Sequence, residues 1–360
     1  MTDQEARLSR LREKMRAADA DGLVVTSPSN VFYLSGFRGS SGALLITEER
    51  ALLFSDFRYR LQAKEQAPET EFMEVPRRLL AHLGEVAVEA GVRRLGYDPD
   101  HLTCTLKEQL AEGAQGAELI GAAGLIEELR AVKSTEEMDL IRAAAALADE
   151  TMTFMRKLLK PGTAESDIAL DGEFFMRREG AEAASFDIIV ASGPRSALPH
   201  AKTTDRELQR GDLVVIDLGA QIGGYCSDIT RTFAVGEASE RMREVYRIVY
   251  AAQRAALAGV RAGAVCGDLD GIARGMIEEA GYGDHFGHGL GHGVGIEVHE
   301  APRLGKGEET VLARGNVVTV EPGIYLDGEG GVRLEDLVFV RDKGAEVLTG
   351  SPMSSELPVI

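Results

Sequence analysis

Two aspartates lie eleven residues apart on neighbouring apolar segments of the sequence. Asp217 stands inside DLVVIDLG, whose valine, isoleucine and leucine residues predict a buried strand, where an unpaired carboxylate is costly. A turn at 221–224 leads into an extended segment with Asp228, and pairing of Ala220 with Tyr225 would place Asp228 directly opposite Asp217. Carboxylates that close repel each other, so the pair predicts either a bound cation or a structural dyad that shares a proton or pairs with arginine.

Three of the seven histidines fall within one glycine-rich segment, GHGLGHGVGIEVHE, which covers residues 287–300. They are His288, His292 and His299. Glycine lets a backbone come close to a ligand, and imidazole binds metals or transfers protons near neutral pH. An isolated histidine is usually structural, but three of them beside so many glycines indicate a site.

Two further acids stand on apolar segments, Glu321 in VVTVEPG and Glu335 in VRLEDLVFV. Each alone fits a surface acid at a strand end or a partner of an arginine, and Arg333 shares a face with Glu335. Together with Asp217, Asp228 and one histidine, they give four carboxylates and one imidazole. That set suits two divalent cations bridged by shared carboxylates. Phosphate-loop, dinucleotide-binding and zinc-finger patterns are absent from the sequence.

Strands and helices that can hold these side chains are predicted from residue 134 onward. Ser134 followed by Glu137 fits a capping box and predicts a long helix that ends at 160–162, where the sequence is Lys-Pro-Gly. Three amphipathic helices follow, at about 166–179, 239–260 and 267–280. Strand hairpins beside these helices favour an α+β fold over a doubly wound sheet.

The first part of the chain, residues 1–125, predicts a separate and smaller α/β domain. Leu8, Leu11 and Met15 recur at helical spacing, and GLVVT, ALLIT and ALLFS are typical of buried strands. A length of 360 residues also favours two domains. We place the second domain at 126–360.

Composition excludes several classes of function. The 40 Lys and Arg residues against 58 Asp and Glu residues give a net charge of −18 without a long basic run, so neither nucleic acid nor a membrane is an expected partner. The three cysteines are widely spaced, and the N-terminus lacks the apolar core of a signal peptide. We therefore expect a protein of the reducing cytoplasm.

The spacing of the four acids around the histidine-rich segment resembles the pita-bread metallopeptidases, specifically the Xaa-Pro peptidases, aminopeptidase P and prolidase. The motifs cover about 180–340, and the N-terminal segment is similar to the smaller domain of that family. The resemblance implies an N-terminal creatinase/prolidase-like domain over 1–125 and a catalytic pita-bread domain over 126–360. It also implies a homodimer.

The same resemblance implies a set of metal ligands. Asp217 would chelate one cation, His292 and Glu321 the other, and Asp228 and Glu335 would bridge both. The cofactors would then be two divalent ions per chain. A hard, oxygen-rich set with a single imidazole suits Mn²⁺, with Co²⁺, Zn²⁺ or Fe²⁺ as alternatives.

The implied reaction is hydrolysis of the Xaa-Pro bond, either at the N-terminus of peptides or in Xaa-Pro dipeptides. A hydroxide between the two cations would attack the carbonyl, and Glu321 would pass its proton to the leaving nitrogen. His299 and His200, which match active-site histidines of the family, would stabilise the tetrahedral oxyanion.

Further positions are assigned to the substrate. By similarity, His288, His200 and Tyr325 would line the pocket for the proline ring. Arg333 would either bind a product-side carboxylate or orient Glu335. Two apolar residues, Phe186 and Ile189, would line the substrate cleft or pack in the core, and the sequence leaves this open.

Two other functions compete with this interpretation. A methionine aminopeptidase shares the five ligands, but the extra N-terminal domain and His288 favour the proline branch. A metal-free member of the same fold, acting as an amidine hydrolase or a peptide-binding module, would have lost metal ligands, and here all five are intact. Whether the substrate is a dipeptide or a longer peptide stays open.

Overall fold

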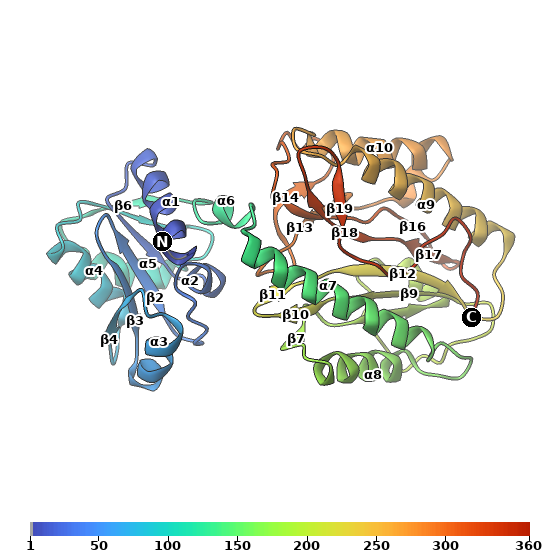
Figure 1. Ribbon diagram of the computed structural model, residues 1–360, viewed down its shortest axis with the longest axis horizontal. Helices are drawn as coiled ribbons and strands as arrows, with labels where there is room; N and C mark the ends of the chain where they lie inside the picture. Colours follow the sequence, from blue (N-terminus) through green and yellow to red (C-terminus); the bar gives the residue numbers. More distant parts are fainter. Residues whose placement is uncertain (1–2) are drawn as a thin grey trace. The chain divides into compact units, whose positions relative to one another are not determined.

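The computed structural model describes residues 3–360, and the chain divides into two compact units, Met1–Arg130 and Ala131–Ile360 (Figure 1). The division lies between the predicted boundary after residue 125 and the predicted helix cap at Ser134. Each unit combines helices with strands, which confirms the predicted α+β class.

The first unit is built on a six-stranded mixed sheet in the order β4-β3-β2-β1-β5-β6. Its strands are β1 (Gly22–Val25), β2 (Ala43–Thr47), β3 (Ala51–Ser55), β4 (Glu71–Glu74), β5 (Arg94–Tyr97) and β6 (Glu118–Gly121). Its helices are α1 (Asp3–Ala17), α2 (Pro28–Ser35), η1 (Phe57–Tyr59), α3 (Arg60–Gln66), α4 (Leu79–Glu89), α5 (Cys104–Gly113) and α6 (Glu127–Arg130). The three predicted strands are β1, β2 and β3, and the predicted apolar stripe of α1 is buried.

Three helices of the second unit begin and end within one residue of their predicted positions, but the long helix that follows Ser134 ends at Arg156, before the predicted 160–162. The helices of this unit are α7 (Thr135–Arg156), α8 (Glu165–Arg178), η2 (Gly193–Ala197), α9 (Glu240–Gly259), α10 (Cys266–Glu279) and η3 (Gly283–His285). The capping box is present at α7, where the Ser134 side chain accepts from the Glu137 amide and the Glu137 side chain accepts from the Ser134 amide.

The strands of this unit form several small sheets. They are β7 (Ala183–Ala184), β8 (Ile189–Ser192), β9 (Leu213–Leu218), β10 (Ala220–Ile222), β11 (Tyr225–Cys226), β12 (Ile229–Ala234), β13 (Gly291–Gly293), β14 (Glu300–Leu304), β15 (Val317–Val320), β16 (Gly323–Leu326), β17 (Gly330–Arg333), β18 (Asp336–Val340) and β19 (Ala345–Val347). The sheet orders are β11-β10-β7, β12-β9-β8, β14-β13-β15-β18-β19 and β16-β17.

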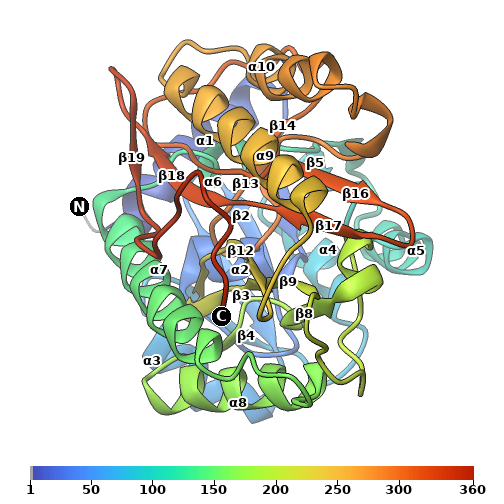
Figure 2. The same ribbon diagram turned by 90° about the vertical axis from the view of Figure 1, so that its right-hand side faces the viewer.

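Two helix pairs cover these strands from opposite sides, as Figures 1 and 2 both show within this unit. α7 and α8 bury apolar side chains against β8, β9 and β12. α9 and α10 pack against β15, β16, β17 and β18. The strands that carry the candidate acids therefore lie between two hydrophobic layers, which fixes the direction in which their side chains point.

The predicted register of the β9–β12 hairpin is wrong by two residues. Ile222 pairs with Tyr225, so the loop has only two residues, Gly223 and Gly224, and Asp217 lies opposite Thr230. Both glycines have positive φ, 59° and 83°, as the tightest hairpin turns require. Asp228 is thus a diagonal neighbour of Asp217, and because side chains alternate with a period of two, it keeps the same face.

Candidate metal centre and active site

Five side chains from separate strand ends meet at one cavity of about 880 Å³ in the second unit. Asp217 lies on β9, Asp228 directly before β12, His292 on β13, Glu321 directly after β15, and Glu335 between β17 and β18. All five of the predicted metal ligands are among the residues that line this cavity.

His292 lies among the acids with one ring nitrogen facing them. Its Nε2 is 3.3 Å from Glu321 Oε1 and 3.7 Å from Asp228 Oδ2, while Nδ1 donates to the Gly293 carbonyl at 3.1 Å. Ligand atoms of Asp228, His292 and Glu335 all lie within 4.8 Å of one another. Because the Gly293 carbonyl accepts from Nδ1, Nε2 is the ring nitrogen that faces the acids, and a metal ion would take the place of the proton there.

The glycines beside His292 are required by strand packing, and one of them, Gly291, also lines the cavity, as the sequence suggested for a ligand's approach. A Cβ atom on Gly291 would lie 2.2 Å from the Thr319 carbonyl oxygen, and one on Gly293 would lie 2.2 Å from the Ala301 carbonyl oxygen. Any larger residue would push the neighbouring strands away. His292 is therefore held by backbone on both sides.

Three carboxylate oxygens in this cluster are buried and receive no hydrogen bond from any described residue: Asp217 Oδ1, Asp228 Oδ1 and Glu335 Oε1. Buried polar atoms are almost always partnered, and an unpartnered carboxylate oxygen is among the costliest exceptions. A divalent cation supplies the missing partner to all three. The donor set, carboxylates with one imidazole, therefore fits divalent metal ions.

The carboxylates also repel one another, and this repulsion shifts their pKa values. Burial, followed by the charges of Glu335 and Asp217, raises the pKa of Asp228 well above its usual value. Burial and the charges of Glu321 and Asp217 do the same to the pKa of Glu335. Burial opposes ionisation of Glu321 too, but the hydrogen bond and charge of His292 outweigh it and lower the pKa of Glu321 to about 2. Cations would remove this conflict.

Arg333 is buried and connects three parts of the site. Its guanidinium donates to four acceptors: Asp217 Oδ2 at 2.6 Å, the Pro199 carbonyl at 2.9 Å, Tyr325 Oη at 3.1 Å and Thr230 Oγ1 at 3.2 Å. The predicted partner Glu335 receives no hydrogen bond from this guanidinium, which contacts Asp217 instead. Most of its N–H groups are thereby occupied, since a guanidinium has only five.

The structure does not bring Tyr325 to the cavity wall, although the sequence assigned it to the substrate. Its hydroxyl lies behind the wall, between Arg333 and His288 Nε2, which it meets at 2.8 Å. His288 Nδ1 donates to the Gly289 carbonyl at 2.8 Å, so Nε2 accepts from the tyrosine. Burial lowers the pKa of His288, which keeps the ring neutral in this arrangement.

The remaining predicted residues all reach the cavity. His200, His299, Phe186 and Ile189 line it, which favours the cleft over the core for the two apolar residues. The rings of His299 and His292 are 4.3 Å apart between centroids. Burial and the charge of His292 lower the pKa of His299.

Sequence reasoning missed two basic side chains that line the cavity, Lys202 and Arg303. Arg303 pairs with His292 across the β13–β14 ladder, which places both side chains on one face. Neither Lys202 nor Arg303 uses its charged group in a hydrogen bond or ion pair with another residue between 3 and 360. The sequence feature that could have indicated Arg303 is the extended segment HEAPRL, residues 299–304, in which alternation of side chains places Arg303 on the same face as His299.

A second group of possible metal ligands lies in the first unit, but unlike the acids of the cavity it has no buried oxygen without a partner. Asp98, His101 and Glu127 have ligand atoms within 4.8 Å of one another. However, His101 Nδ1 lies 3.0 Å from Asp98 Oδ2, and Glu127 Oε1 accepts from Asn30 at 2.5 Å. None of the three has a buried oxygen without a partner. This cluster therefore gives no sign of a missing cation.

Comparison with known proteins identifies the family. Residues 139–342 match the profile of metallopeptidase family M24. The chain belongs to metallopeptidase family M24. Residues 7–132 of this M24 chain match the creatinase/prolidase N-terminal domain. Both matches confirm the predicted family and the predicted pair of domain types.

Relatives of the M24 chain cover nearly its whole length. It is 39% identical over 345 residues to an Xaa-Pro dipeptidase of Pyrococcus furiosus, covering 95% of this chain and 97% of the relative. A solved Xaa-Pro dipeptidase from Bacillus anthracis has a TM-score of 0.96 and 41% identity, covering 99% and 100% of the two chains. A solved X-Pro aminopeptidase from Thermotoga maritima has a TM-score of 0.88 and 36% identity, covering 97% and 100%.

Membership of a metallopeptidase family implies divalent metal ions for the M24 chain, and the buried acids described above are where they fit. No helix between residues 3 and 360 is both long and apolar enough to cross a membrane.

Proposed function

We propose that this M24 metallopeptidase hydrolyses the Xaa-Pro bond of dipeptides and of short peptides with a free N-terminus, using two divalent cations, with Mn²⁺ as the best match. The observation that carries the proposal is the cluster of three buried acids, the partly buried Glu321 and His292, with three unpartnered oxygens, opening into a cavity lined by three more histidines. The names of the Pyrococcus and Bacillus relatives support the choice of bond.

The proposed ligands divide between two sites. Asp217 would hold one cation, His292 and Glu321 the other, and Asp228 and Glu335 would be shared. When bound, the cations would lower the pKa of a water molecule and polarise the scissile carbonyl. Arg333 orients Asp217, because its Nη2 donates to Oδ2 at 2.6 Å.

Proton transfer is assigned to Glu321. Its carboxylate lines the cavity, so an oxygen can accept the proton of the attacking water and then deliver it to the prolyl nitrogen. His299 and His200 line the same cavity and can donate N–H groups to the oxygen of the tetrahedral intermediate.

Recognition of the proline side is assigned to His288 and the apolar residues Phe186 and Ile189. A prolyl nitrogen carries no N–H, so its pocket needs shape rather than an acceptor. His288 supplies a ring held in one orientation by Gly289 and Tyr325. In this proposal Tyr325 therefore acts through His288.

A free carboxylate on the substrate would find a counter-charge at Arg303 and Lys202, whose charged groups lack partners among the described residues. This favours Xaa-Pro dipeptides, whose carboxylate lies next to the scissile bond. The related X-Pro aminopeptidase of Thermotoga keeps longer peptides as the second candidate.

A substrate panel tests the proposal. Manganese-loaded protein should release alanine from Ala-Pro and Ala-Pro-Ala and should leave Met-Ala-Ala intact. Cleavage of Met-Ala-Ala with both proline peptides left intact would instead support a methionine aminopeptidase. A protein that binds less than one divalent ion per chain after manganese loading would support a metal-free binding module.

A further inference from the structure

A buried glutamate outside the cavity lies at the base of one cavity wall. Glu165 is the first residue of α8, and its side chain has no exposed surface. It is neither a proposed metal ligand nor a residue that lines the cavity. A carboxylate in such a place persists only where hydrogen bonds replace the lost water.

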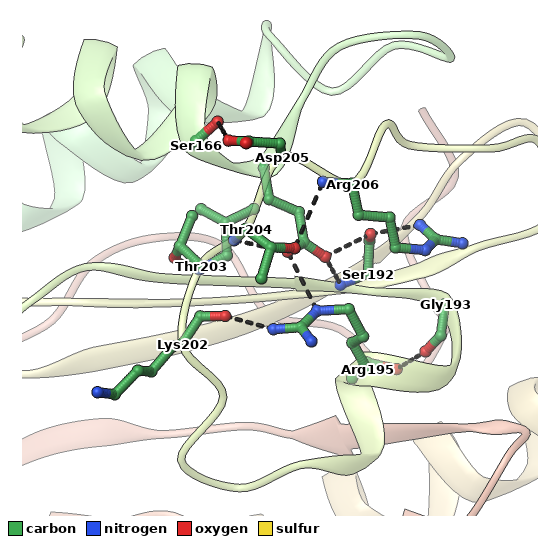
Figure 3. A network of polar contacts seen from close by, with 12 residues as sticks. Ser166, Ser192, Gly193, Arg195, Lys202, Thr203, Thr204, Asp205 and Arg206 are labelled. Carbon is green, nitrogen blue, oxygen red and sulfur yellow. Dashed lines mark hydrogen bonds and ion pairs between the residues drawn. The ribbon is translucent and has the colours of Figure 1, made fainter.

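Both oxygens of Glu165 are occupied, each by a different end of one loop. Oε1 accepts from the backbone amide of Ser192 at 2.8 Å and from its hydroxyl at 2.7 Å. Oε2 accepts from the amide of Thr204 at 3.1 Å and from its hydroxyl at 2.8 Å. Arg195 Nε approaches the same oxygen at 3.3 Å. Figure 3 shows these donors gathered around one point.

The loop closed by this carboxylate, residues 193–203, forms one wall of the cavity. Five consecutive positions of it, from Pro199 to Thr203, line the cavity, and His200 is the second of them. The exposed His200 side chain makes no hydrogen bond with any other described residue. Its position therefore depends on how the backbone of the loop is held.

The loop has a second anchor on the metal side. Arg333 Nη1 donates to the Pro199 carbonyl at 2.9 Å, and the amide of Gly331 donates to Ser196 Oγ at 2.9 Å. These contacts hold the far side of the loop but leave its two ends unconnected. Arg195 also donates to the Lys202 carbonyl, and Thr203 Oγ1 accepts from the Val190 amide at 3.0 Å and donates to the Ile188 carbonyl at 2.9 Å. Among the described side chains that hold this loop, Glu165 is the one that receives hydrogen bonds from both flanking residues, Ser192 and Thr204.

We propose that Glu165 is a positioning residue for hydrolysis: by joining the two ends of the 193–203 loop, it sets where His200 stands at the reacting carbonyl. This inference rests on the proposed function, because it takes His200 as a group that contacts the substrate. Loss of the anchor would displace His200 while Arg333 keeps Asp217 in place, so turnover would fall and metal binding would not.

Glu165→Gln is the test variant because it keeps the volume of the side chain. The amide retains one acceptor oxygen, but its NH₂ group would meet the N–H and O–H donors of one loop end. Hydrogen exchange measured by mass spectrometry on the manganese-loaded protein should then show faster exchange in peptides from 193–204. Glu137→Gln is the matched control, since Glu137 is also buried in this unit and accepts from Tyr225 at 2.9 Å.

Activity is measured as kcat/KM in a double-mutant cycle that compares wild type, Glu165→Gln, His200→Ala and the double variant. Glu165→Gln alone should lower kcat/KM for Ala-Pro by about tenfold to a hundredfold, as expected when a reacting group is misplaced. In the His200→Ala background it should lower kcat/KM by no more than about twofold, because the group it positions is already gone. Bound manganese per chain should equal that of wild type.

The outcomes separate the possibilities. Full additivity in the cycle, or unchanged exchange in 193–204, would overturn the positioning role even if wild type cleaves Ala-Pro. A wild type that leaves Ala-Pro intact would overturn the proposed function, while the exchange measurement would still report on the loop anchor. If Glu165→Gln does not fold, Thr204→Val removes one donor of the same anchor, with Thr151→Val in α7 as its control, and the same results are expected in smaller degree.

Discussion

Removal of the Tyr325 hydroxyl distinguishes between two roles for this residue. It either contacts the substrate directly or supports His288 from behind the cavity wall. The oxygen accepts from Arg333 at 3.1 Å and donates to His288 at 2.8 Å. Tyr325→Phe removes both bonds. The bond from the charged guanidinium contributes about 1.5–3 kcal/mol and the neutral one about 0.5–1.5 kcal/mol, so we expect the free energy of unfolding to fall by about 2–4 kcal/mol.

Calorimetry and kinetics on the manganese-loaded protein measure the two effects together. Each kcal/mol lowers Tm by about 2–4 °C in a domain of 150–250 residues, so Tm should fall by roughly 4–16 °C. kcat/KM for Ala-Pro should fall as well, because the His288 ring loses the donor that fixes Nε2. Tyr282→Phe is the control, since the hydroxyl of this half-buried tyrosine makes no hydrogen bond with another described residue.

One result would refute the placement of Tyr325. If Tm stays at the wild-type value while KM for Ala-Pro rises, the hydroxyl contacts substrate directly and its two hydrogen bonds to Arg333 and His288 do not stabilise the fold.

Three further predictions concern the acids and the cavity. Because the folded, metal-free protein raises the pKa of Asp228 and Glu335, their protonated forms stabilise it below the unfolded pKa of about 4, and this stability is lost as pH rises through the folded values. The Tm gap between manganese-loaded and chelated protein should therefore widen from about pH 5 to about pH 8, and a constant gap would contradict the raised pKa values. Glu321→Gln should lower kcat for Ala-Pro by at least about a hundredfold, because an amide cannot accept the proton, and near-normal kcat would eliminate Glu321 as the base. Arg303→Ala should lower kcat/KM for Ala-Pro about tenfold but leave Ala-Pro-amide almost unchanged, and an equal loss for both would show that Arg303 does not bind the carboxylate.

The elements that hold the site were predictable where a local signal marked them. The capping box at Ser134 and Glu137 fixed the start of α7, because its two hydrogen bonds depend only on residues three apart. The four acids were recognisable because they stand on largely apolar segments, and the resemblance to the family selected His292 among the three histidines of the glycine-rich segment. Cytoplasmic location and a homodimer stay predictions.

The register of the β9–β12 hairpin and the depth of Tyr325 below the cavity were harder to predict. The Asp217–Asp228 pairing depended on the length of the turn, and two glycines with positive φ made it shorter than predicted. The error was two residues, so both acids still share a face. Tyr325 was assigned to the cavity by similarity to the family, and the sequence gives no measure of how many side chains separate its hydroxyl from the cavity.

In the proposed mechanism, the guanidinium of Arg333 would couple metal uptake to substrate recognition. One group contacts Asp217, the carbonyl before His200, and the tyrosine that orients His288. If a cation at Asp217 shifts this planar guanidinium, the shift would move both His200, through the Pro199 carbonyl, and His288, through Tyr325. Thermodynamic reciprocity then requires that a bound peptide tighten the affinity for metal by the same factor by which metal tightens the affinity for the peptide.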